Sequence, residues 1–101
     1  MEQRTISNDP FAPLRQRFLA RCADQLAELM AASQGGDLHG GSLDSVVRIA
    51  HSLAGAAGTF GFAELSVRAS ALETLLIEQS DEGAANAALD ALIVEIERTL
   101  T

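Results

Sequence analysis

The spacing of apolar residues along the 101-residue chain predicts four amphipathic helices. The first is expected to start at the capping sequence Asn8-Asp9-Pro10 and to end near Ser33, before a glycine-rich loop over residues 34–41. Ser42 is expected to cap the second helix, which runs to about residue 60 and is ended by Gly61. The apolar stripe of the first helix consists of Phe11, Leu14, Phe18, Cys22, Leu26 and Leu29.

Two further helices complete a predicted bundle. The third is expected from residue 62 or 63 to Glu78, and the fourth from a break at residues 80–83 to the C-terminus. Because isolated helices of this kind need one another's apolar faces, we expect an all-α fold: an antiparallel up-down four-helix bundle over residues 10–101, preceded by a flexible N-terminus over residues 1–9. The inward positions of the last three helices are predicted to be Val46, Ala50, Leu53, Ala57 and Phe60, then Leu65, Ala69, Leu72 and Leu76, then Leu89, Leu92, Ile93, Ile96 and Leu100.

Composition and charge restrict what such a bundle binds. The formal net charge is −7 at pH 7, which argues against binding to nucleic acid or to an anionic membrane. No apolar run reaches the roughly 20 residues of a membrane-spanning helix, and the polar N-terminus lacks the apolar stretch of a signal peptide. Cys22 is the single cysteine, and its place on an apolar stripe predicts a buried, unreactive thiol. We therefore expect a soluble, cytoplasmic domain that is monomeric in isolation.

His51 is the residue of greatest chemical interest. On a helical wheel it lies well off the apolar stripe of the second helix, so its side chain is expected to be exposed. Gly55 and Gly58 follow it on the same face, and each costs a helix interior about 0.5–1 kcal/mol relative to alanine. These glycines allow either a neighbouring helix of the same chain or another molecule to approach closely. Two of them beside one exposed imidazole favour the second interpretation.

A hairpin turn at Gly61 predicts which residues of the next helix lie opposite His51. In an antiparallel pair, facing residues then have numbers that sum to about 124, which places Glu73 opposite His51. A carboxylate that accepts the Nδ1–H of a histidine fixes the tautomer and leaves Nε2 available. The alternative is that Glu73 is an ordinary solvated glutamate. The same register pairs Ala54 with Ser70 and Gly58 with Ser66.

An exposed histidine can bind a metal, take part in hydrolytic catalysis or accept a phosphoryl group. No second His or Cys lies three or four residues from His51, and His39 falls in the glycine-rich loop, where we expect an exposed residue with no ligand role. Hydrolysis needs a nucleophile, an oxyanion site and a pocket, for which the sequence gives no sign. A phosphoryl acceptor needs only an oriented Nε2 and space for a partner. Of the three functions it therefore requires the fewest features that the sequence does not show.

Residues 50–62 read AHSLAGAAGTFGF, and they are followed by Leu65, Ala69, Leu72 and Glu73. This pattern resembles the histidine phosphotransfer (HPt) domains, and its Gly-Thr-Phe-Gly-Phe ending is similar in particular to the N-terminal phosphoacceptor domains of CheA chemotaxis kinases. The matched core covers about a quarter of the chain, and the helix layout is compatible over nearly all of it.

The resemblance implies a function for each of these positions. His51 would be phosphorylated at Nε2 by a kinase's ATP-binding domain and would pass the phosphoryl group to an aspartate of a CheY-like response regulator, where Mg²⁺ resides. Glu73 would orient the imidazole, and Gly55 would make room for the phosphate and the regulator. The domain would hold no cofactor or metal of its own: ATP belongs to the kinase, and no glycine-rich phosphate loop occurs here. The regulator is expected to dock on Val47, Arg48, Ala54, Gly55, Gly58 and Ser70.

The chain also departs from the family pattern. Ala54 stands where the family usually has a lysine, and Ser70 stands where CheA domains often have a second histidine. Arg48 lies one turn before His51 and is at best a partial substitute for the lost positive charge. These departures leave alternatives open: a stand-alone HPt domain of another phosphorelay, a degenerate HPt domain that only binds a regulator, or, with little support, a metal-binding bundle. CheA phosphoacceptor domains usually carry a fifth helix, so the chain is expected to be a domain excised from a larger kinase or a four-helix form.

Overall fold

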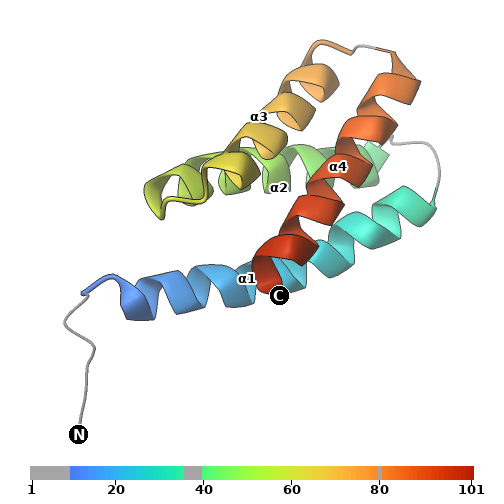
Figure 1. Cartoon of the computed structure of the whole chain (residues 1–101). Helices are drawn as coiled ribbons and strands as arrows, with labels where there is room; N and C mark the ends of the chain where they lie inside the picture. Colours follow the sequence, from blue (N-terminus) through green and yellow to red (C-terminus); the bar gives the residue numbers. More distant parts are fainter. Residues whose placement is uncertain (1–9, 36–39, 80) are drawn as a thin grey trace, which may run out of the picture.

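A computed structural model describes residues 10–35, 40–79 and 81–101, which form four helices that alternate in direction (Figure 1). The helices are α1 (Ala12–Gln34), α2 (Gly40–Thr59), α3 (Ala63–Ile77) and α4 (Glu82–Leu100). This confirms the expected all-α bundle. The predicted flexible N-terminus, the capping residues Asn8 and Asp9, and His39 lie outside the described residues.

The four helices pack in a closed cycle, in which each contacts its two neighbours: α1 with α2, α2 with α3, α3 with α4, and α4 with α1. Contact is most extensive between α2 and α3 and least extensive between α1 and α2. The helix that carries His51 is therefore held mainly by α3, and much of its outer side is left to solvent.

Apolar residues from every helix fill the core, and most of the predicted inward positions are buried. Phe11 and Leu14 are exceptions, because 56% and 43% of their respective surfaces are exposed. They precede Phe18, the residue of α1 that contacts the end of α2, and the hairpin leaves this first part of α1 largely uncovered. Leu100, at the end of α4, is also exposed. No helix in residues 10–35, 40–79 and 81–101 has the length and apolar character needed to span a membrane.

Two of the predicted helix starts are wrong. Helix α1 begins at Ala12 without a side-chain cap, and Pro13 occupies its first turn in place of Pro10. Helix α2 begins at Gly40, so Ser42 lies inside its first turn and is not the capping residue. Gly40, the first residue of α2, has φ = 57°, a backbone conformation that glycine adopts without strain.

The turn between α2 and α3 is fixed by backbone hydrogen bonds and by aromatic packing. Gly61 has φ = 87°, and the amides of Gly61 and Phe62 donate to the carbonyls of Gly58 (3.3 Å) and Ala57 (2.8 Å). This is the Schellman pattern, in which a glycine in the left-handed region ends the helix. The rings of Phe60 and Phe62 then lie against that of Phe18 in α1, with centroid separations of 5.4 and 5.6 Å respectively. Together these contacts set the register of the α2–α3 hairpin.

Candidate functional site

The hairpin brings His51 and Glu73 together. Nδ1 of His51 lies 2.7 Å from Oε2 of Glu73, although the two residues are 22 positions apart in the chain. The carboxylate of Glu73 accepts from Nδ1–H in this contact, and in the neutral form of the imidazole Nε2 then carries the lone pair. The predicted pairing of these residues is therefore present, and Glu73 is not simply a solvated glutamate.

The two members of this pair differ in exposure. The His51 side chain is 78% exposed, whereas that of Glu73 is 20% exposed. No other hydrogen bond or ion pair of the His51 side chain occurs within the described part of the chain. A partly buried carboxylate thus holds one side of the ring, and the Nε2 side faces solvent.

The glycines beside His51 have different surroundings. A Cβ on Gly55 would meet no atom of the chain within 4 Å, so no neighbouring helix requires a glycine there. A Cβ on Gly58 would lie 3.5 Å from Oγ of Ser66, an ordinary packing distance against α3. Of these two glycines, therefore, only Gly55 leaves unoccupied space on the outer surface that the packing of the chain does not require.

Two hydroxyl groups near the site were not singled out in the sequence. Ser66 donates a 2.7 Å hydrogen bond from Oγ to the carbonyl of Ala54, and this bond ties α3 to α2 one turn beyond His51. Thr59 donates from Oγ1 to the carbonyl of Gly55 (3.1 Å) within α2. The predicted register had already placed Ser66 beside this part of α2, which is the only sign of its role that the sequence carries.

The remaining residues expected at a docking surface vary in accessibility. Arg48 and Ser70 are exposed, whereas Val47 and Ala54 are half-buried. Arg48 forms no ion pair with any described residue, which leaves its guanidinium available one helical turn before His51.

Cys22 belongs to the core of the bundle and not to this exposed surface. It is fully buried, and burial raises the pKa of its thiol to about 11, an effect that the nearby Arg21 only partly opposes. The thiol is therefore protonated at neutral pH, as expected for an unreactive core residue. Among the residues that the structure describes, no group of three or more His, Cys, Asp and Glu side chains is placed to hold a metal ion.

Comparison with known proteins identifies the family of the chain. A family model described as "Hpt domain" matches residues 13–101, which is most of the chain. The chain therefore belongs to the Hpt family, the histidine phosphotransfer domains of two-component systems, which interact with histidine kinases and response regulators. No curated protein and no solved structure gives a significant match.

Proposed function

We propose that His51 is the phosphoacceptor of this domain. In this proposal the ATP-binding domain of a histidine kinase phosphorylates Nε2, and the phosphoryl group then passes to the aspartate of a CheY-like receiver domain. The observation that carries the proposal is the 2.7 Å hydrogen bond from His51 to Glu73 on a ring that is otherwise exposed.

This hydrogen bond suits both transfer steps. In the first, the Nε2 lone pair forms a bond to the γ-phosphorus of ATP while the bond from phosphorus to the ADP oxygen breaks. The ring becomes a phosphorylated imidazolium that keeps its Nδ1–H, and the Glu73 carboxylate stabilises the positive charge. In the second, an aspartate oxygen attacks phosphorus, the N–P bond breaks, and neutral imidazole leaves. No proton has to be gained or lost on His51, because Nδ1–H stays on the ring throughout.

Arg48 is the cation best placed to meet the phosphoryl group. It lies three residues before His51, and side chains at this spacing are neighbours on a helix surface. We propose that its guanidinium, which forms no ion pair with a described residue, partly replaces the lysine that the family usually has at the position of Ala54.

We further propose that the pathway is chemotactic and cytoplasmic, and that the domain belongs to a CheA-like kinase. The Gly-Thr-Phe-Gly-Phe sequence at residues 58–62 supports this, since it resembles the corresponding sequence of CheA phosphoacceptor domains. In the structure it forms the Schellman turn and supplies two of the three phenylalanine rings that lie together there. A stand-alone HPt domain of another phosphorelay is the alternative, and the identity of the receiver decides between the two.

Ala54 favours a second candidate function, that of a regulator-binding module that carries no phosphate. A methyl group at this position gives no charge to hold a phosphoryl group, and the Ser66 hydroxyl already engages the Ala54 carbonyl. Such a module would bind a receiver domain while remaining unlabelled by kinase and ATP.

One experiment separates the two functions. The domain is incubated with histidine kinases of its source organism and ATP, and the labelled protein is then mixed with each purified receiver domain in the presence of Mg²⁺. We expect acid-labile, alkali-stable label on the domain and its rapid loss to one receiver. A domain that binds a receiver but never acquires label would support the binding module instead.

Gly55→Ala tests whether the open space serves the partner. Because the added methyl group meets nothing within 4 Å, the substitution is expected to stabilise the isolated domain by about 0.5–1 kcal/mol, measured by thermal unfolding. The same methyl group is expected to slow transfer to the receiver by hindering its approach. Unchanged transfer in a stabilised variant would mean that the partner does not approach Gly55.

A further inference from the structure

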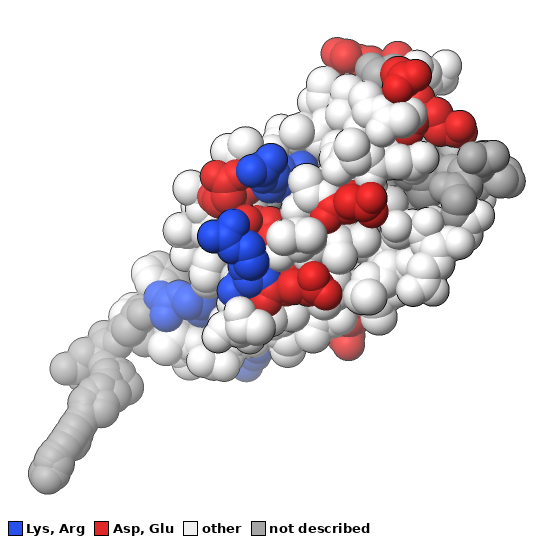
Figure 2. Space-filling model, turned by 45° about the vertical axis from the view of Figure 1, so that its right-hand side comes forward, with Lys and Arg blue, Asp and Glu red and all other residues white. Residues whose placement is uncertain are grey.

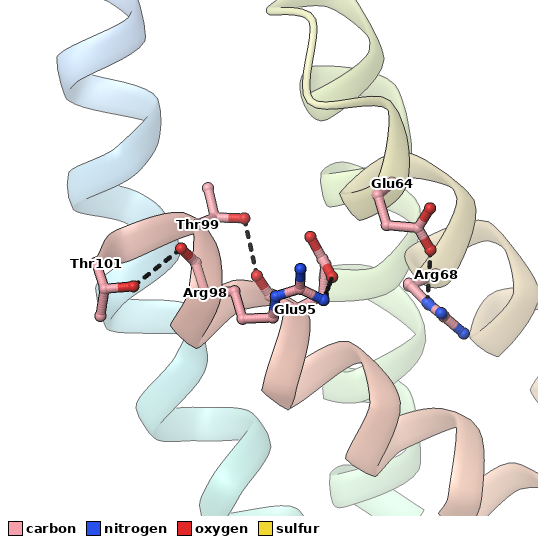
Figure 3. Close-up of polar contacts among 6 residues, drawn as sticks. All are labelled: Glu64, Arg68, Glu95, Arg98, Thr99 and Thr101. Carbon is pink, nitrogen blue, oxygen red and sulfur yellow. Dashed lines mark hydrogen bonds and ion pairs between the residues drawn. The ribbon is translucent and has the colours of Figure 1, made fainter.

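Ser66 uses its hydroxyl group to join two helices. A serine or threonine inside a helix commonly donates to the carbonyl four residues earlier in the same helix. Thr99 does so in α4, where its Oγ1 lies 2.8 Å from the carbonyl oxygen of Glu95 (Figure 3). Ser66 instead donates across the hairpin to the carbonyl of Ala54 in α2, at 2.7 Å, although 12 positions separate the two residues. Its hydroxyl therefore connects α3 to α2 and not two turns of α3.

Ser66 and Glu73 lie on the same side of α3. They are seven positions apart in the sequence, which is close to two helical turns, so their side chains project in directions only about 20° apart. Gly58 and His51 are related in the same way on α2, and a Cβ on Gly58 would lie 3.5 Å from Oγ of Ser66. The contact of Ser66 with α2 thus lies on the same side of the hairpin as the contact of Glu73 with His51, about 10 Å closer to the turn.

Few other polar contacts fix how α3 is oriented on α2. Within residues 40–79, the side-chain hydrogen bonds between these two helices are the two just described. The ion pair of Arg68 with Glu64 (2.8 Å) lies within α3 (Figure 3). The fully buried positions of the two helices include Ala50, Ala57 and Ala69, whose methyl groups add to the burial of apolar surface, an effect that has no preferred direction.

Charge does not hold the far end of α3 on α2 either. Acidic side chains gather where α3 and α4 are joined, at the top of Figure 2. They include Glu78, Asp81 and Glu82, which are all exposed. The start of α2, at the same end of the hairpin, carries a further carboxylate, Asp44, and the one arginine of α2, Arg48, forms no ion pair with any described residue. The orientation of α3 therefore depends on contacts nearer the turn.

We infer that Ser66 is a positioning residue for the phosphoacceptor: its hydrogen bond to α2 fixes the rotation of α3 about its own axis and so holds the Glu73 carboxylate at Nδ1 of His51. This inference rests on the proposed function. A glutamate side chain has several rotatable bonds, and holding it against an exposed partner costs conformational entropy. Because the Ser66 bond fixes α3 two turns away on the same side, fewer conformations of Glu73 compete with the one that reaches the ring.

The test compares Ser66→Ala with a matched control, Ser33→Ala. Oγ of Ser33 in α1 donates to Oδ1 of Asp90 in α4 (3.1 Å), so the control also removes one hydrogen bond between two helices, but away from the α2–α3 hairpin. Both substitutions are made in a His39→Gln protein, in which His51 is the single histidine. Circular dichroism and thermal unfolding verify that both variants fold.

The state of the imidazole is measured first. In protein that contains ¹⁵N-labelled histidine, NMR at alkaline pH reports which ring nitrogen carries the proton. We expect the Nδ1–H form to predominate in the parent protein and in Ser33→Ala, because Glu73 accepts from Nδ1–H in both. Ser66→Ala is expected to contain a mixture of this form and the Nε2–H form. A loss of stability alone would not change the protonated nitrogen of the folded protein.

The rate of phosphorylation is measured next, with phosphoramidate as a small donor that needs no docking. We expect Ser66→Ala to acquire label about three- to tenfold more slowly than Ser33→Ala, which is the range that the loss of one hydrogen bond covers. Ser66→Thr retains a hydroxyl group at this position and is expected to restore both the Nδ1–H form and the rate.

Combined substitutions test whether Ser66 acts through Glu73. In a Glu73→Ala protein, Ser66→Ala is expected to have no further effect on the labelling rate, because the carboxylate that it positions is absent. Equal slowing with and without Glu73 would overturn the positioning role, and so would an unchanged Nδ1–H form in Ser66→Ala. An equal loss of rate in Ser33→Ala would also overturn it, since the effect would then be one of general stability.

Failure of the proposed function would look different. If neither a kinase with ATP nor phosphoramidate labels His51 in the wild-type protein, the phosphocarrier function fails before Ser66 is considered. If His51 is labelled and Ser66→Ala acquires label as fast as Ser33→Ala, only the positioning role is wrong.

Discussion

Replacing His51 by glutamine is expected to abolish labelling of the domain by its kinase and ATP. The amide nitrogen of glutamine has no lone pair available for attack on phosphorus, so no slower version of the reaction replaces it. The side chain is 78% exposed and its one hydrogen bond within the described residues is to Glu73, so the bundle is expected to fold normally. Incorporation of label measures the first effect, and circular dichroism measures the second.

The chain provides its own control for this substitution. His39 is the other histidine of the sequence, and His39→Gln is expected to take up label at the wild-type rate and stoichiometry. Acid-labile label on the His51→Gln protein would place the phosphoacceptor elsewhere and would remove the basis of the proposed function.

Glu73→Ala is expected to slow phosphorylation by about 10–100-fold without abolishing it. The nucleophile remains, but without the carboxylate the Nδ1–H is no longer fixed and the positive charge of the phosphorylated ring loses its partner. Rapid-quench measurement of labelling by kinase and ATP gives the rate. Glu73→Gln is expected to fall between wild type and alanine, because its amide oxygen can still accept from Nδ1–H but carries no charge.

A matched control for Glu73 lies on the same helical hairpin. Glu78 is exposed at the end of α3, and Glu78→Ala removes the same charge without touching His51. It is expected to be phosphorylated at the wild-type rate. If Glu73→Ala is labelled as fast as Glu78→Ala, the 2.7 Å hydrogen bond has no part in the transfer.

The pairing of His51 with Glu73 could be predicted from the sequence because its geometry is local to one hairpin. Gly61 marks the turn, and once the turn is placed, helical periodicity alone puts Glu73 opposite His51. The same reasoning placed Ser66 beside Gly58 but did not show that its hydroxyl reaches the carbonyl of Ala54. That contact depends on how closely the two helices approach, which side-chain periodicity does not determine.

Features that depend on α1 were less predictable. The connection from α1 to α2 includes residues 36–39 and carries no turn pattern that fixes how the two helices align. The sequence therefore did not indicate that Phe18 contacts Phe60 or that Phe11 and Leu14 are exposed. Ser42 was wrongly assigned as a cap because α2 begins two residues earlier, at Gly40.

The buried thiol of Cys22 has a practical consequence. It is the single cysteine of the chain, it is fully enclosed, and its pKa of about 11 keeps it in the unreactive protonated form. Thiol-specific reagents can therefore modify the protein only when the bundle opens, and the rate of modification reports that opening directly. The chain thus contains an internal chemical probe of its own conformational stability, which needs no introduced label.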